Sequence, residues 1–121
     1  MEPTEFDAVV DGTADGAVIH CEGDLNVRAD AALEAAYAQA ASLGGTQITL
    51  DFARVGYINS TGIALIVRML TTARADGRTV RVSGLTDHYR QIFEITRLSD
   101  YMAILYDAPF VAIASPEGVA Q

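Results

Sequence analysis

The chain has 121 residues, of which 50% are hydrophobic and 20% are charged. This is enough material for one core and too little for two, so the sequence excludes both a multidomain enzyme and a disordered chain. The formal net charge of −8 lies entirely in residues 1–34, where nine acids face Arg28 alone. Such an acidic segment disfavours direct binding to nucleic acid or anionic lipid; it suits a basic protein partner or is simply solvated surface.

Hydrophobic periodicity and turn signals predict alternating strands and helices. The chain begins with strands at 9–10 and 17–21, joined by the turn-forming segment 11–16, and continues with a helix over 28–43 and a strand over 48–52. The next helix has Ile63, Ile66, Val67 and Leu70 on one face and ends at Asp76-Gly77, before a strand over 80–82. A helix capped by Thr86 and bearing Tyr89, Ile92 and Phe93 follows, then a strand over 101–105 and a last helix opened by Asp107 and Pro109. This order predicts an α/β fold with a mixed, mostly parallel β-sheet of about five strands and about four helices.

The pattern predicts a single domain over residues 5–114, with short flexible termini at 1–4 and 115–121. The start of the chain lacks the cationic and apolar stretches of a signal peptide, and its longest strongly apolar run, 63–67, is far below the roughly 20 residues that span a bilayer. We therefore expect a cytoplasmic protein without membrane insertion. The single cysteine, Cys21, cannot form an intramolecular disulfide, and we expect it to be a small buried side chain.

The segment Arg54 to Gly62 is the most conspicuous connection between a strand and a helix. Loops at the carboxyl ends of parallel strands commonly carry binding groups, and a helix N-terminus stabilises an anion. Here Asn59-Ser60-Thr61-Gly62 stands directly before an apolar helix. The residues alone leave two interpretations open, a simple N-cap by Ser60 or Asn59 and an anion or partner site. A P-loop lacks its lysine, and a nucleophile elbow would need glycine at Ile58.

Two motifs resemble a known family. The stretch from Asp51-Phe52 through Asn59-Ser60-Thr61-Gly62-Ile63-Ala64-Leu65 resembles the signature of the STAS domain. Glu22-Gly23-Asp24-Leu25-Asn26, followed by an alanine-rich helix, is similar to the second landmark of that family. The resemblance covers roughly residues 5–114 and is to the free-standing bacterial anti-sigma factor antagonists. The resemblance implies a regulator without catalysis or cofactor. This regulator binds an anti-sigma factor that is also a serine kinase, and a serine phosphatase restores its unphosphorylated form.

The resemblance also implies the residues of the site. It places the phosphate acceptor at Ser60, with Thr61 as the alternative, and the partner-binding residues at Asp24, Asn26, Asn59, Ser60, Thr61 and Gly62. Asn59 and Asn26 stand where the family usually has aspartate, and each removes a negative charge that would pair with an arginine of the partner. Arg97 stands where a glycine commonly ends the third helix.

Two other functions stay open. One is a STAS-like accessory subunit of a membrane transporter that docks its second helix on a cytoplasmic ATPase, which the two asparagines slightly favour. The other is a small domain that binds a nucleotide or anion at the same helix start. As to oligomeric state, a weak homodimer is compatible with the sequence. We expect no enzyme and no metal site, because no nucleophile and base pair is evident and His20 and His88 lack ligand spacing.

Overall fold

The computed structural model describes residues 4–105 and contains a five-stranded sheet with the order β1-β2-β3-β4-β5. The elements are β1 (Asp7–Gly12), β2 (Gly16–Leu25), the 3-10 turn η1 (Val27–Ala29), α1 (Asp30–Ser42), β3 (Gln47–Ile58), α2 (Ser60–Ala75), β4 (Thr79–Ser83), α3 (Asp87–Ile95), the 3-10 turn η2 (Leu98–Asp100) and β5 (Ala103–Ile104). β1 and β2 form an antiparallel hairpin, and the later neighbours are all parallel. The predicted α/β class and mixed, mostly parallel sheet are confirmed. The predicted last helix at Asp107 and Pro109 lies outside the described residues.

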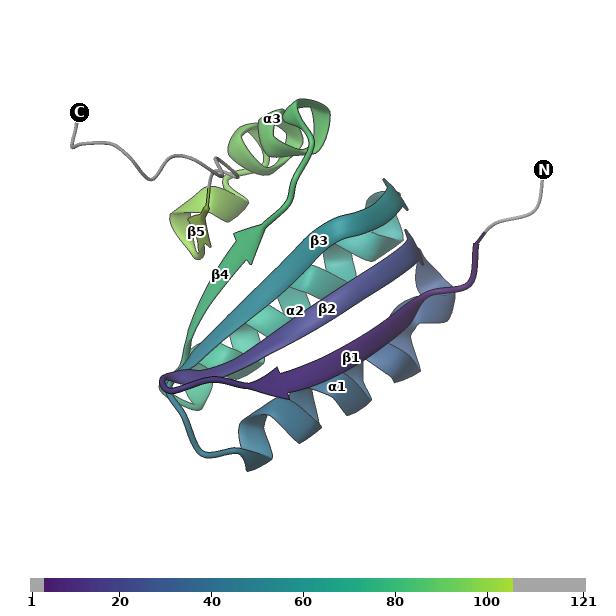
Figure 1. Cartoon of the computed structure of the whole chain (residues 1–121). Helices are drawn as coiled ribbons and strands as arrows, with labels where there is room; N and C mark the ends of the chain where they lie inside the picture. Colours follow the sequence, from purple (N-terminus) through teal and green to yellow (C-terminus); the bar gives the residue numbers. More distant parts are fainter. Residues whose placement is uncertain (1–3, 106–121) are drawn as a thin grey trace, which may run out of the picture.

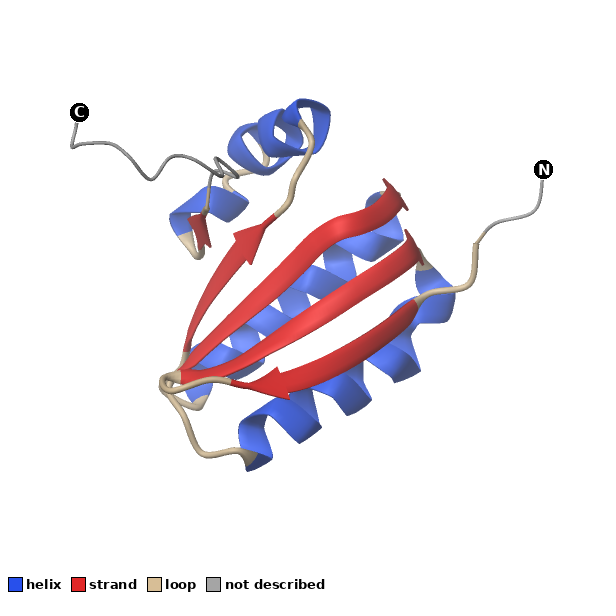
Figure 2. Cartoon of the chain, viewed as in Figure 1, coloured by secondary structure: helices blue, strands red, loops and turns tan. Residues whose placement is uncertain are grey.

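The helices α1 and α2 lie side by side across one face of the sheet (Figure 1). Every second residue of β2 is buried on this face, from Ala17 to Leu25. The opposite face carries polar side chains such as His20 and Asp51, and α3 lies beyond the end of β4 (Figure 2). The largest fully buried side chains are Ile19, Leu25, Ile48, Leu50, Ile66, Val82 and Phe93. One core therefore joins the sheet to both covering helices and to α3.

β3 is longer than predicted, and the expected loop over residues 54–58 is wrong: these residues belong to the strand. Opposite β2, the register shifts twice, between His20 and Glu22 and between Gly23 and Asp24, so that β3 carries an extra residue at each shift. At the first bulge the Oδ1 atom of Asp51 accepts a hydrogen bond from the Ala53 N–H at 3.0 Å. The bulges replace the two-residue alternation of a strand by a spacing of three, which is typical of a loop or a helix.

Other boundaries differ less. β2 continues beyond the predicted Cys21 as far as Leu25, and α1 begins at Asp30 after η1 instead of at Arg28. β5 is confined to Ala103–Ile104 within the predicted 101–105. Arg97 follows α3 with a φ of 68°, in the left-handed region that glycine adopts most readily. Its Nε atom bonds to Asp100 Oδ2 at 2.7 Å, which helps to hold this turn.

Candidate functional site

The first turn of α2 presents two exposed hydroxyl groups, those of Ser60 and Thr61. Asn59 is the N-cap: its backbone is extended, and its Oδ1 atom accepts a hydrogen bond from the Gly62 N–H at 2.8 Å. Of the two residues that the sequence offers as a cap, Asn59 is therefore the one that serves. The Ser60 hydroxyl, at the first helical position, lies at the surface instead.

Gly62 fixes the position of this helix start against β2. A Cβ atom on Gly62 would lie 2.0 Å from the carbonyl oxygen of Leu25, so only glycine allows this close approach. The same oxygen accepts a hydrogen bond from the Asn59 N–H at 3.3 Å. Gly62 itself is buried and is not part of the exposed surface. Its close packing against β2 determines the position of the exposed Ser60 and Thr61.

The end of β3 is held from the other side by α3. The Tyr89 hydroxyl accepts a hydrogen bond from the Ile58 N–H at 3.0 Å. The spacing of the third helix predicts Tyr89 as a core side chain, and nothing in the sequence indicates that its hydroxyl meets this backbone. The half-buried Tyr89 therefore positions the strand end that precedes Ser60.

The β2 end brings Asp24 and Asn26 to the same edge of the sheet, because Leu25 pairs with Ile58 in parallel register. Asp24 is half-buried, and its Oδ2 atom accepts a hydrogen bond from the Thr4 N–H at 3.1 Å. Asn26 caps η1, with its Oδ1 atom bonded to the Arg28 N–H at 2.9 Å. The structure thus places the predicted residues at the ends of two neighbouring strands and in the cap residues and helix start that follow them.

Two exposed apolar side chains, which the sequence alone does not single out, flank these connections. Val27 is 64% exposed just after Asn26, and Tyr57 is 52% exposed near the end of β3. Exposed aromatic side chains beside polar groups are common in protein interfaces. No signal in the sequence indicates the exposure of Tyr57, because it depends on the bulges that form where β3 pairs with β2.

The electrostatics of the helix start favour an anion. The first turn of α2 has no acidic residue, so the positive end of the helix dipole is not offset by a carboxylate of that turn.

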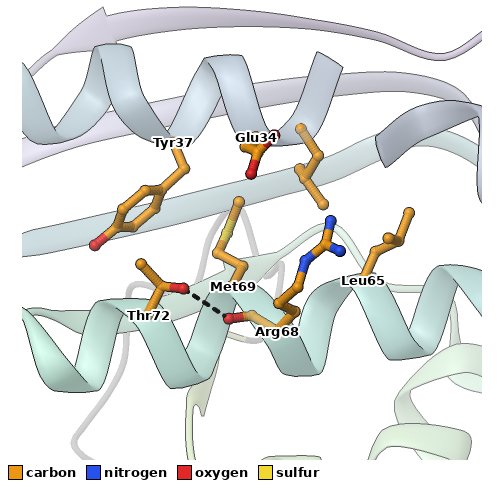
Figure 3. Close-up of a pocket in the computed structure, with 7 residues that line it drawn as sticks. Glu34, Tyr37, Leu65, Arg68, Met69 and Thr72 are labelled. Carbon is orange, nitrogen blue, oxygen red and sulfur yellow. Dashed lines mark hydrogen bonds between the residues drawn. The ribbon is translucent and has the colours of Figure 1, made fainter. Parts of the chain in front are cut away.

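Arg68 lies two turns further on and pairs with Asp30 at the start of α1. Figure 3 shows Arg68 in a depression between α1 and α2 that Glu34, Tyr37 and Met69 also line. Arg68 therefore ties the two helices together.

The remaining titratable candidates lie away from this edge. His20 is on the open face of the sheet, with Nδ1 2.8 Å from Asp51 Oδ2 and Nε2 3.2 Å from Asp11 Oδ2. Cys21 is buried, as predicted, and its burial raises the pKa of the thiol to about 12. Within residues 4–105 no group of three or more His, Cys, Asp or Glu side chains is arranged to hold a metal ion, and no helix is long and apolar enough to cross a membrane.

The fold and the exposed helix start define a small α/β domain that presents hydroxyl groups at the edge of a mostly parallel sheet. A family model described as "Mlab, STAS domain" matches residues 8–106. The chain therefore belongs to the STAS domain family, as its motifs indicated.

Individual relatives point in the same direction. The chain is 29% identical over 82 residues to an anti-sigma-B factor antagonist of Staphylococcus aureus, covering 68% of this chain and 76% of the relative. Its fold is similar to an anti-sigma factor antagonist from Mycobacterium paratuberculosis, with a TM-score of 0.70, 16% identity and coverage of 85% and 86% of the two chains. It is also similar to SpoIIAA in its unphosphorylated form, with a TM-score of 0.64, 19% identity and coverage of 84% and 88%. These structural likenesses concern the fold.

Proposed function

We propose that this protein is an anti-sigma factor antagonist, a regulator that acts by binding and not by catalysis. In this proposal the Ser60 hydroxyl is phosphorylated by an anti-sigma factor of the ATP-dependent serine kinase type and is restored by a serine phosphatase. The observation that carries the proposal is the exposed Ser60 at the start of α2, whose hydroxyl is not used for capping because Asn59 supplies the cap. Thr61, exposed beside it, is the alternative acceptor.

We infer a docking edge for the partner that comprises Asp24, Asn26, Asn59, Ser60, Thr61 and, through its packing, Gly62. A phosphate at Ser60 would add nearly two negative charges and three acceptor oxygens to this edge. The helix start favours an anion, so the domain keeps its fold and the partner senses the change. Burial of an unmatched dianion in an interface costs several kcal/mol, which changes occupancy by orders of magnitude.

The proposal includes a cytoplasmic location, no direct contact with nucleic acid, and no cofactor. The acidic front of the chain supports a protein partner with a basic surface, since like charge repels phosphate backbones. The 29% identical anti-sigma-B factor antagonist of Staphylococcus aureus supports the class of partner.

The test uses the kinase-type partner captured from the native cell with the full chain. We expect Ser60→Ala to abolish phosphate incorporation and to keep binding, and Ser60→Glu to weaken binding by about tenfold or more, through charge placed in the interface. Thr61→Ala separates the two neighbouring hydroxyl groups and should keep phosphate incorporation, because Ser60 remains. Phosphate incorporation that persists in Ser60→Ala, or full binding by Ser60→Glu, would contradict the switch.

A second function is favoured by one observation, the use of both Asn26 and Asn59 as neutral caps where an acid would bear charge. A fixed docking face needs no charge that changes, so the domain would serve as an accessory subunit of a membrane transporter, bound to its cytoplasmic ATPase. In that case the ATPase co-purifies with the unchanged chain and equally with Ser60→Glu. If the partner co-purifies with the unchanged chain but not with Ser60→Glu, the result supports the antagonist function.

A further inference from the structure

The depression between α1 and α2 has a volume of about 120 Å³ (Figure 3). Its floor consists of three buried apolar side chains, Leu33 from α1 and Leu65 and Met69 from α2. Glu34 points into it from α1, and Arg68 points into it from α2. Pockets that bind cofactors or nucleotides commonly measure about 300–1,000 Å³, so this depression has room for one long side chain and not for such a ligand.

The depression continues the docking edge along one side of α2. Thr61 of the docking edge stands four positions before Leu65 and seven before Arg68, so these three side chains share one side of the helix. The rise from Thr61 to Leu65 along the helix axis is about 6 Å. A protein that contacts the docking edge therefore reaches the depression within about one helical turn.

The charged groups around the depression leave one carboxylate available. The guanidinium of Arg68 is paired with Asp30, and the Tyr37 hydroxyl donates a hydrogen bond to Asp76 Oδ2 at 2.7 Å. The Glu34 side chain is exposed, and its carboxylate has neither a hydrogen bond nor an ion pair among residues 4–105. Asp30 and Glu34 against Arg68 leave one net negative charge at the depression.

An apolar floor beside an unpaired carboxylate matches the two parts of a basic side chain. Lysine and arginine bury their methylene stems on apolar surface while their charged heads stay at a polar rim. Glu34 supplies the opposite charge for such a head, whereas an acidic side chain would meet it as a like charge. Glu34 also belongs to the acidic segment 1–34, whose field attracts a basic surface from a distance.

We propose that the depression between α1 and α2 receives one basic side chain of the protein that binds the docking edge. The identity of that protein rests on the function proposed above, whereas the chemistry of the depression follows from its own lining. Asn26 and Asn59 place no charge on the docking edge, and the Asp24 carboxylate already accepts a backbone N–H. Glu34 therefore gives a basic partner a free carboxylate next to that edge.

The chemistry of the depression is tested without the partner, with the peptide acetyl-Ala-Ala-Lys-Ala-Ala-amide as the probe. We expect this peptide to shift the methyl NMR signals of Leu33, Leu65 and Met69 in the full chain until they saturate. Glu34→Gln should weaken this binding by about threefold or more, because the opposite charge is lost. Asp15→Asn is the control, since it removes one exposed acid of the same segment at the opposite end of β2 and should leave the binding unchanged. Unshifted methyl signals, or equal binding by the two variants, would overturn the proposal.

The use of the depression by the partner is tested with the purified kinase-type protein and the full chain. We expect Glu34→Gln to weaken binding by about threefold or more and to reduce its salt dependence, and Asp15→Asn to leave the affinity unchanged. If Ser60→Glu loses the partner while Glu34→Gln binds as the unchanged chain does, the proposed function stands and the role of the depression is overturned. If the unchanged chain binds no kinase-type protein, the proposed function fails, and the peptide measurement still supports or overturns a site for a basic side chain.

A second copy of the chain is the competing occupant, because it would offer an arginine to the same depression. Sedimentation of the unchanged chain and of Glu34→Gln separates the two cases. We expect both to sediment alike. Self-association that Glu34→Gln abolishes would assign the depression to a second copy and overturn the assignment to a partner.

Discussion

Asn59 and Ser60 divide two tasks at the start of α2. A serine at an N-cap commonly uses its hydroxyl to accept a backbone N–H. Here the Asn59 side chain accepts the hydrogen bond from the Gly62 N–H, and Ser60 lies one position further into the helix, where its hydroxyl faces solvent. A modification of Ser60 can therefore change the surface without removing the cap. Asparagine provides this cap without adding a negative charge to the helix start.

Cys21 makes a residue-scale prediction about pH. Burial, with a smaller contribution from the charge of Asp51, raises the pKa of its thiol from 9.0 to about 12. Below about pH 9 the thiol is neutral in the folded and the unfolded chain alike, whereas above it only the unfolded chain ionises. We therefore expect the free energy of unfolding to fall between about pH 9 and about pH 12 through this group.

Urea unfolding at about pH 8 and about pH 10 measures this loss, and Cys21→Ala is the control. The variant lacks the thiol but keeps every tyrosine and arginine, so their titration cancels in the comparison. The unchanged chain should lose more stability than Cys21→Ala over this interval. Equal losses would show that the thiol ionises in the folded state as easily as in the unfolded one.

At the scale of elements, the sequence predicts the regular parts of the fold and fails where the backbone departs from regularity. Strict alternation identifies the start of β3, and helical spacing identifies α2 and α3. The end of β3 is missed because Phe52, Val55 and Ile58 are buried three positions apart, a spacing produced by bulges that depend on pairing with β2. Tertiary pairing of this kind leaves no local signal in one chain.

The candidate site shows the same division. The motif identifies Ser60 and Thr61, and the structure places them at the surface as the proposal needs. The exposure of Val27 and Tyr57 and the hydrogen bond from Ile58 to the Tyr89 hydroxyl depend on elements distant in sequence. Such contacts follow from the assembled sheet and cannot be inferred from spacing.

Gly62 provides the prediction at this scale, because it sets the distance between α2 and β2. Its Cβ in Gly62→Ala would lie 2.0 Å from the Leu25 oxygen and 2.8 Å from the Leu25 carbonyl carbon, so backbone must move. We expect a loss of about 1–3 kcal/mol or more in the free energy of unfolding, measured by urea denaturation.

Gly56→Ala is the matched control on the adjacent strand. Its Cβ would have Asp24 Oδ1 as its nearest neighbour at 3.9 Å, an ordinary contact, so the change should stay within about 0.5 kcal/mol. If the two variants lose equal stability, the close approach of α2 to the end of β2 is not what makes glycine necessary at position 62.

For the molecule as a whole, one continuous core connects every layer. Phe93 of α3 is fully buried in the same cluster as Ile66 of α2 and Ile19 of β2, and Leu98 of η2 belongs to it as well. A domain with a single core of this size unfolds in one cooperative step, because no layer keeps its apolar surface covered once another leaves. In Figure 1, α3 lies apart from α1 and α2, so the specific expectation is that α3 unfolds together with these helices.

We therefore expect thermal unfolding to follow one transition with coincident signals from two probes. Far-UV circular dichroism reports the helices, and near-UV absorbance reports the five tyrosines of a chain that has no tryptophan. The enthalpy should be about 70 kcal/mol for a domain of roughly 100 residues, and the calorimetric and van't Hoff values should agree. Tyr89 and Tyr101 flank the buried Phe93 and Leu98 in the chain, so an earlier change in the tyrosine signal would show that α3 and η2 separate first and that the single core is wrong.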